Sequence, residues 1–181
     1  DGGYIMGGRS SSNISGDKSQ NSKGFDDFWI VKTDSAGNKI WDKTIGGNYA
    51  DQLISIIQTT DKGYLLGGHS YSDTSEDKSQ NSKGGTDFWI VKVDSIGNKK
   101  WDKIIGGSST ETLNSMIKTA DNGYLLGGHS TSDISGDKSQ NSIGIYDYWV
   151  VKIDSIGNKL WDKTFGGRAA DILLSVIQTT D

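Results

Sequence analysis

The sequence predicts an all-β fold, a β-propeller-type array of three four-stranded antiparallel meander blades, with an open β-repeat solenoid as the alternative. The first observation is a gapless 60-residue period, which makes Asp1, Asp61 and Asp121 equivalent positions. The second is that short β-branched and aromatic runs alternate with Gly-, Asn- and Asp-containing turns. The third is the lack of helical periodicity. The predicted units are residues 1–60, 61–120 and 121–181, within a larger ring, array or assembly.

The first half of each repeat predicts a hairpin. Residues 53–60 form a β-branched run that predicts a strand, here called strand A. A three-residue turn follows at 61–63, where Gly63 is expected to take the left-handed backbone conformation. Residues 64–70 predict strand B. Its paired glycines, Gly67-Gly68, indicate that a neighbouring backbone or a bulky side chain approaches closely.

The second half predicts a long loop and another hairpin. Residues 71–86 are polar and rich in Ser, Asp, Lys and Asn, which predicts a loop. Residues 88–94 predict strand C and residues 100–105 predict strand D. Gly97 lies between them and can take the positive φ that a tight hairpin turn requires.

Alternation along strand C predicts that both faces of each sheet are covered. Trp89, Val91 and Val93 should lie on one face, and Phe88 and Ile90 on the other. One four-stranded sheet cannot bury both of its faces, but stacked copies can. The tryptophans are therefore expected to be structural residues that pack between blades: Trp29, Trp41, Trp89, Trp101, Trp149 and Trp161.

Composition excludes several classes of protein. The chain has no cysteine, which excludes disulfides, cysteine metal clusters and thiol catalysis. Its net charge is -4, and charges of both signs are interspersed without the basic face that nucleic-acid binding needs. No apolar run approaches the ~20 residues of a membrane-spanning helix.

One segment carries a family resemblance. The run from Asp94 through Gly97 to Trp101 resembles the Asp…Gly…Trp hairpin of quinoprotein-type propellers, although it is one residue shorter between Asp and Gly. It is also similar to the Asp-box hairpin of sialidase-type propellers, with longer spacing. Over its whole length the chain resembles the Asp-Gly-Gly-Tyr, Trp-Ile-Val-Lys and Gly-Asn-Lys-x-Trp-Asp-Lys repeats of secreted bacterial surface proteins. This resemblance implies a propeller-like fold and an extracellular or cell-surface location.

The long loops contain candidate calcium ligands. A meander places these loops and the connections from strand D to strand A at one edge of the stack, near Asp51, Glu111 and Asp171. Oxygen-bearing side chains recur there at every second residue, a spacing that lets them converge on one hard cation. The alternative is a polar loop held by Asx and Ser/Thr turns, because lysine replaces the turn glycine and no bidentate glutamate follows. The candidate ligands are Asp73, Ser75, Asp77, Asn81, Asp133, Ser135, Asp137 and Asn141.

A non-enzymatic function is predicted. His69 and His129 are matched by Arg9 in the first repeat, so no histidine role is common to the array, whereas an active site needs different residues at one point. The Lys/Asp pairs Lys43/Asp42, Lys103/Asp102 and Lys163/Asp162 are expected on a solvated face. The predicted function is adhesion or surface and filament structure in an extracellular bacterial repeat module. A carbohydrate-binding propeller that uses Tyr71 and Tyr146 on the loop face is the alternative, and a hydrolase domain is least favoured.

The ends of the chain predict association. The first repeat lacks its own strand A, and residues 173–180 form a strand A without a strand B. Three blades are fewer than the ~4–8 of known propellers, so the unpaired strands are expected to join another chain or flanking repeats. The sequence therefore predicts partners that are copies of the same repeat, with surface glycans as a further candidate.

Overall fold

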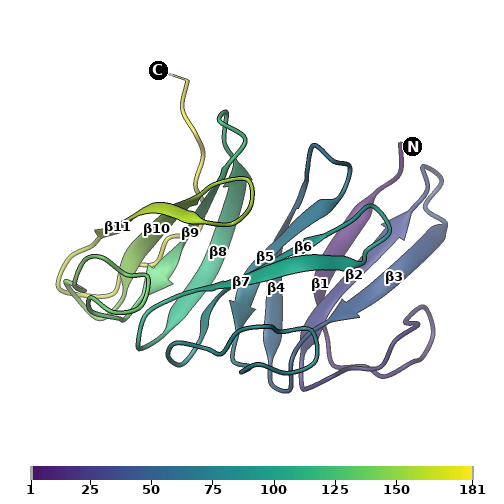
Figure 1. Ribbon diagram of the computed structural model, residues 1–181, viewed down its shortest axis with the longest axis horizontal. Helices are drawn as coiled ribbons and strands as arrows, with labels where there is room; N and C mark the ends of the chain where they lie inside the picture. The colour runs from purple at the N-terminus through teal and green to yellow at the C-terminus, as the bar shows by residue number, and fades with distance from the viewer. Residues whose placement is uncertain (1, 181) are drawn as a thin grey trace.

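The computed structural model describes residues 2–180 and confirms an all-β repeat array. The described residues form antiparallel strands in three sheets and no helix, so none of them forms a helix able to cross a membrane. Figure 1 shows the sheets side by side along the chain. The strands are β1 (Ile5–Ser10), β2 (Asp27–Thr33), β3 (Lys39–Ile45), β4 (Asp51–Gln58), β5 (Tyr64–Ser70), β6 (Asp87–Val93), β7 (Lys99–Ile105), β8 (Glu111–Lys118), β9 (Tyr124–Ser130), β10 (Asp147–Ile153) and β11 (Lys159–Phe165).

Each sheet is a meander. The second sheet has the order β4-β5-β6-β7 and the third has the order β8-β9-β10-β11. These correspond to the predicted strands A, B, C and D. In the described residues the first sheet contains β1, β2 and β3, which correspond to strands B, C and D. The predicted four-stranded unit is therefore confirmed in two sheets, and the first sheet is one strand short.

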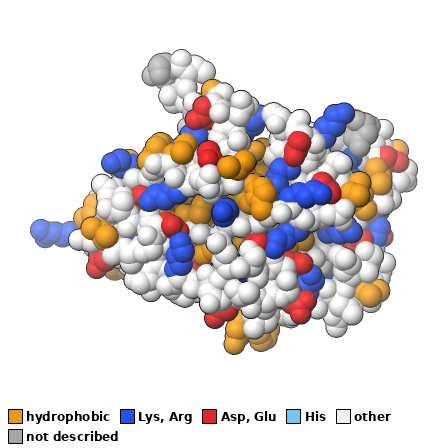
Figure 2. Space-filling model, in the orientation of Figure 1, with side chains coloured by type: hydrophobic (Ala, Val, Ile, Leu, Met, Phe, Trp, Pro, Cys, Tyr) orange, Lys and Arg blue, Asp and Glu red, His pale blue; other side chains and the backbone are white. Residues whose placement is uncertain are grey.

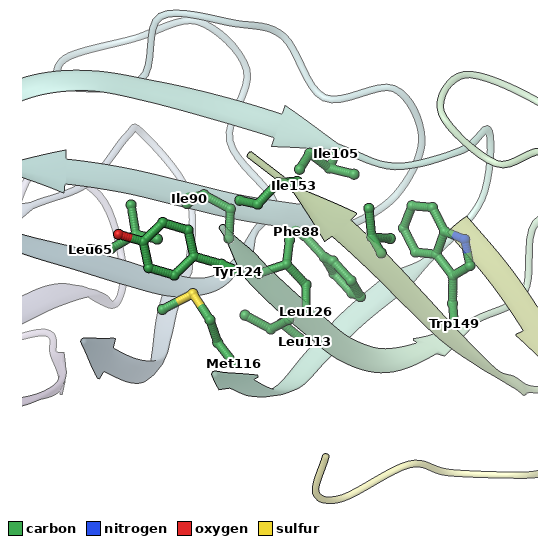
Figure 3. Packing of buried hydrophobic residues seen from close by; sticks show 11 residues of the cluster. Leu65, Phe88, Ile90, Ile105, Leu113, Met116, Tyr124, Leu126, Trp149 and Ile153 are labelled. Atoms are coloured by element: carbon green, nitrogen blue, oxygen red, sulfur yellow. The ribbon is translucent and has the colours of Figure 1, made fainter. Parts of the chain in front are cut away.

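The core lies between the sheets. Trp89, Val91 and Val93 pack in the cluster between the first and second sheets, whereas Phe88 and Ile90 pack in the cluster between the second and third. Figure 3 shows the second cluster, where Phe88 and Ile90 approach Leu126 and Trp149 of the next sheet. The predicted alternation along strand C is thus confirmed, and the second sheet is covered on both faces.

Burial divides the tryptophans according to their position in the stack. Trp89 and Trp149 are fully buried, as predicted. Trp41 and Trp101 are half-buried at the rim of an interface, so the predicted docking between sheets is seen but the burial is partial. Trp29 and Trp161 lie on the two end sheets, where no further sheet covers them, and Trp161 is 44% exposed.

The hairpin turns correct one prediction about glycine. Lys62, with φ of 65°, takes the left-handed conformation that was expected of Gly63. Gly63 is needed for space instead, because a Cβ there would lie 2.4 Å from both the Nζ atom of Lys92 and the carbonyl oxygen of Val93. At the other hairpin Gly97 has φ of 83°, as predicted.

The paired glycines of strand B behave as expected. A Cβ on Gly67 would lie 2.9 Å from the sulfur of Met116 in the next sheet. A Cβ on Gly68 would lie 2.0 Å from the carbonyl oxygen of Gln52 on the adjacent strand. The backbone therefore excludes a side chain at Gly68, whereas a side chain at Gly67 would require the Met116 side chain to shift.

The predicted final strand does not form. Residues 173–180 are extended over the third sheet but belong to no strand. A strand requires a paired neighbour. Strands β4 and β8 pair with β5 and β9, whereas no described residue pairs with this segment. Leu173 is nevertheless buried, so the segment is held by side-chain packing without a β ladder.

Candidate functional site

The long loops and the D-to-A connections meet at one edge of the stack, as the meander predicts. The backbone N–H of Asp77 donates to the carbonyl oxygen of Gly46 at 3.1 Å. The N–H of Asn48 donates to the Ser75 hydroxyl at 3.0 Å. The long loop of the second sheet is therefore hydrogen-bonded to the connection that leaves the first sheet. The polar residues of this edge thus join neighbouring repeats.

One buried carboxylate at the start of each strand C organises its loop. Asp87 accepts a hydrogen bond from the Ser82 hydroxyl at 2.5 Å and another from the Lys83 N–H at 2.7 Å, both at Oδ2. Its Oδ1 atom is buried without a hydrogen-bond partner and occupies the space that a side chain at position 106 would fill. Gly106 is thus required by the carboxylate beside it. Asp27 with Gly46 and Asp147 with Gly166 repeat the arrangement.

A second buried carboxylate ties each strand A to the loop of the same sheet. Glu111 accepts hydrogen bonds from the Gly107 N–H and from the Ser132 hydroxyl, at 2.7 and 2.6 Å. Burial raises the pKa of Glu111, and the negative charge of Asp87 adds to this rise. Burial likewise raises the pKa of Asp51, the equivalent residue of the preceding repeat.

A buried lysine lies among these carboxylates. Lys78 is 2% exposed, and its ammonium group donates to the carbonyl oxygen of Ser72. Burial lowers the pKa of Lys78, while the charges of Asp51 and Asp87 act in the opposite direction. Lys138 has the same surroundings in the third repeat. The buried lysines and carboxylates of the loop edge therefore partly offset one another's charge, although burial still shifts the pKa of both lysines and of the two strand A carboxylates toward the neutral form.

The predicted calcium ligands lie in one loop of each repeat, but their oxygens are directed to protein donors. Asp73 Oδ1 accepts from the Ser82 N–H at 3.1 Å, and Asn81 Oδ1 accepts from the Thr74 N–H at 3.0 Å. Ser75 donates to the Asp73 carbonyl at 2.9 Å. The third repeat shows the same pattern through Asp133, Ser135 and Asn141.

The remaining candidate ligands form ties between sheets. Asp77 accepts from the Gly46 N–H at 3.2 Å and forms an ion pair with Lys23 of the preceding repeat. Asp137 makes the equivalent contacts with Gly106 and Lys83. Within residues 2–180, no three acidic, histidine or cysteine side chains are grouped to hold a metal ion. Calcium binding stays a prediction, with a different role now visible for its candidate ligands.

The Trp-Asp-Lys segment corrects another prediction. Asp42, Asp102 and Asp162 were expected on a solvated face, but all three are buried. Asp102 accepts from the Trp89 indole N–H at 3.0 Å and forms an ion pair with Lys99 at 2.6 Å. Burial acts to raise the pKa of Asp102, but the hydrogen bonds from Lys99, Ser79 and Trp89 outweigh it and lower this pKa. The aspartate is therefore the polar anchor of the buried tryptophan.

Sequence reasoning missed an aromatic group at the loop edge. The rings of Phe25 and Tyr49 are stacked, with centroids 6.4 Å apart, and both side chains are exposed. Tyr71 is also exposed, as predicted, and its N–H donates to the Ala50 carbonyl, beside Tyr49. One repeat further along the chain, the equivalent positions are Gly85 and Ser109 of the second repeat and Thr131 of the third. This departure from the repeat was the signal in the sequence that could have revealed the aromatic group.

A cavity opens on the face of the first sheet that points away from the second. Its volume is about 500 Å³, and Met6, Trp29, Val31, Gly37 and Lys39 are among its lining residues. The equivalent face of the second sheet is covered by the first sheet, and that of the third by the second. The cavity therefore lies on the face that, in the second and third sheets, contacts the preceding sheet. Lys and Arg side chains are interspersed with acidic ones over the face drawn in Figure 2.

The fold and this edge define the chain as an all-β repeat protein of stacked antiparallel sheets. No family model matches it. The chain is similar to the regulatory protein FlaEY of Caulobacter vibrioides (strain ATCC 19089 / CIP 103742 / CB 15), with 22% identity over 164 residues. That match covers 86% of this chain but 17% of the relative, so the chain spans a small part of the protein that it resembles.

Proposed function

We propose that the chain is a non-enzymatic extracellular bacterial repeat module that serves adhesion or surface and filament structure. The observation that carries this proposal is the repetition of one inter-sheet interface. Phe28 of the first sheet packs on Trp89 of the second with ring centroids 4.9 Å apart, and Phe88 packs on Trp149 of the third at 5.0 Å. A unit that stacks on its own copies extends by simple repetition, which is how repeat proteins build long structures.

The polar groups support the same proposal. The buried carboxylates and lysines of the loop edge are occupied in joining one repeat to the next, as in the ion pairs Lys23–Asp77 and Lys83–Asp137. Their arrangement recurs from repeat to repeat, whereas catalysis brings different groups together at one point.

Surface labelling tests the proposed location and role. An antibody raised against the chain is applied to intact and to permeabilised cells of the bacterium that encodes it. We expect labelling of intact cells, and we expect deletion of the repeats to reduce attachment of the cells to a surface. Labelling that appears only after permeabilisation would contradict an extracellular module.

The exposed aromatic group favours a second candidate, a carbohydrate-binding module. Phe25, Tyr49 and Tyr71 lie at the loop edge, and aromatic faces in such positions can stack on sugar rings. A glycan array tests it with three substitutions, each taken from the equivalent position one repeat further along the chain: Phe25→Gly, Tyr49→Ser and Tyr71→Thr. Binding that these changes abolish, and that Ile145→Gly in the third repeat leaves intact, would favour the carbohydrate-binding function.

A further inference from the structure

The two end faces of the stack are the two halves of the interface that is filled twice inside the chain. On the first sheet Tyr4 is 61% exposed, whereas the equivalent Tyr64 and Tyr124 of the second and third sheets are 4% exposed. Trp29 is only half-buried, whereas Trp89 is fully buried beneath Phe28. The first sheet thus presents the surface that receives a preceding sheet.

The third sheet presents the opposite surface. Tyr148 stands at the position of Phe28 and Phe88, the rings that cover a tryptophan of the following sheet, and it is 38% exposed. Trp161 is 44% exposed, whereas the equivalent Trp41 lies against the next sheet. The third sheet therefore carries the groups that the cavity of the first sheet lacks.

Gly37 shows how closely the two surfaces match. A Cβ on Gly97 would lie 3.0 Å from the Trp41 ring, and a Cβ on Gly157 would lie 2.9 Å from the Trp101 ring. At the equivalent Gly37 no atom lies within 4 Å. The space beside Gly37 thus corresponds to a tryptophan from a preceding repeat.

The extended segment at residues 171–180 supplies the missing backbone partner. Asp171 donates its N–H to the Tyr146 carbonyl at 2.7 Å, as Asp51 does to Asp26 at the start of β4. Asn114 then donates to the Leu173 carbonyl at 2.7 Å. The segment is therefore held over the third sheet in the manner of β4 over the first. In the described residues its backbone has no ladder partner, and one edge of β1 is likewise unpaired.

We propose that a second copy of this chain docks head to tail, its residues 171–180 adding as a strand to β1 of the first copy. The register follows that of β4 with β5, in which Leu53 is opposite Gly68. Leu173 is the equivalent of Leu53 two repeats later, and Gly8 is the equivalent of Gly68 one repeat earlier. Leu173 of one copy therefore lies opposite Gly8 of the next. Tyr148 then covers Trp29, and Trp161 fills the space beside Gly37. The inference rests on the proposed structural function and names its partner.

The junction between copies differs from the inner interfaces by one ion pair. Inside the chain Lys23 pairs with Asp77, and Lys83 pairs with Asp137. The equivalent pair across the junction would join position 143 to Asp17, but position 143 is isoleucine. The junction therefore lacks this tie and is expected to be weaker than the inner interfaces, which suits reversible association. Two copies supply six sheets, so the head-to-tail contact either closes a ring or continues into a filament.

Sedimentation velocity of the full chain over a range of concentrations tests the docking. We expect masses that rise in multiples of 19.5 kDa. A chain that remains a monomer at all concentrations would overturn the inference. A monomer whose tryptophan fluorescence responds to an oligosaccharide would overturn it in favour of a glycan in the cavity.

Gly8→Ala is the sharpest variant. A Cβ at the equivalent Gly68 would lie 2.0 Å from the Gln52 carbonyl, but at Gly8 nothing lies within 4 Å. The alanine should therefore leave the melting temperature of the dilute monomer unchanged and weaken association at least tenfold, because the added strand would meet it. Ile96→Asp, at an exposed hairpin turn away from both end faces, is the control and should associate normally. Unaltered association of Gly8→Ala would refute the register.

Ile143→Lys should strengthen the association between copies, because it restores the ion pair with Asp17 of the next copy. We expect association to tighten roughly twofold to fivefold at low salt, the range for an exposed pair. Ile143→Gln, of similar length but uncharged, is the matched control. Equal affinities for the lysine and glutamine variants would contradict the predicted placement of the two end faces.

A cross-link reports the register directly, because the chain has no cysteine of its own. Gln52 lies opposite His69 in β4 and β5, so Ile172→Cys in one copy should face Arg9→Cys in another. Mixing these two single variants should give an oxidised dimer, whereas mixing Ile177→Cys with Arg9→Cys should not. Cell labelling is independent of these measurements. An intracellular location would refute the proposed function but not the association. A monomeric chain would refute the association but not the proposed function.

Discussion

Replacing Trp89 and Trp29 by alanine, in two separate variants, should measure what the neighbouring sheet contributes to the stack. Both indole N–H groups donate to an aspartate, at 3.0 Å from Trp89 to Asp102 and at 3.1 Å from Trp29 to Asp42. The two sites differ in cover. Trp89 is fully buried with the Phe28 ring 4.9 Å away, whereas Trp29 borders the open cavity of the first sheet.

The magnitude follows from this burial. Trp89→Ala should cost about 3–5 kcal/mol of unfolding free energy, the range for a large aromatic removed from a core. Trp29→Ala should cost roughly half as much, because one face of its ring already borders solvent in the monomer. For a chain of 181 residues, a loss of about 4 kcal/mol corresponds to a decrease of about 8–16 °C in melting temperature.

Thermal and urea unfolding followed by circular dichroism measures both variants. The protein is kept dilute, so that docking of a second copy does not cover Trp29. Equal losses for the two variants, within about 0.5 kcal/mol, would refute the argument that the inter-sheet contact stabilises the buried ring. The half-buried Trp101 should fall between them, below the cost that full burial would have predicted.

Four further predictions concern single groups. Asp102→Asn should cost about 1.5–3 kcal/mol in the same unfolding assay, because it removes the charge that the buried hydrogen bonds and the ion pair require. Gly68→Ala should destabilise the chain in that assay, whereas Gly8→Ala should not, because a Cβ would contact a carbonyl oxygen only at the former. Burial lowers the pKa of His69 to about 4, with the charges of neighbouring His129 and Arg9 adding to it, so the unfolded state takes up a proton first as the pH falls from about 6.5. Stability should therefore fall by about 3 kcal/mol between pH 6.5 and 4, and His69→Gln should lose this part of the pH dependence; an NMR titration that gives an ordinary histidine pKa would contradict it. Calcium should leave the melting temperature unchanged, because Asp77 is already engaged by a lysine and a backbone amide; a gain of ~2.7 kcal/mol at a hundredfold excess over the dissociation constant, lost in Asp77→Ala, would support the calcium site.

The loop edge shows why local patterns identified the residues but not their role. The spacing of Asp73, Asp77 and Asn81 correctly placed polar groups in one loop at the edge shared with the D-to-A connections. Their partners lie far away in sequence, as in the ion pair of Asp77 with Lys23. A pattern within one loop contains no information about a lysine 54 residues away, so the pattern alone could not reveal the tie between repeats that Asp77 forms.

The Trp-Asp-Lys segment gives the same lesson for burial. Charged residues that alternate with apolar ones usually face solvent, and on that basis Asp102 was placed at the surface. Both faces of an interior sheet are covered here, so the aspartate is buried and its hydrogen bonds with Trp89 and Lys99 compensate the charge. Period-two alternation cannot distinguish a solvated face from a polar stripe inside a stack.

The sequence alone determined the strands of the three sheets and their meander order, because these depend on local periodicity, turn residues and the 60-residue repeat. It did not determine the state of residues 173–180, which form no strand because no described residue pairs with them. The tertiary structure decided which residues at the same position of the repeat also have the same burial. Trp29 and Trp89 occur in nearly the same local sequence, yet one borders a cavity and the other is fully buried. The physical reason is that burial depends on the neighbouring sheet, and a residue near the end of a stack has a neighbour on one side only.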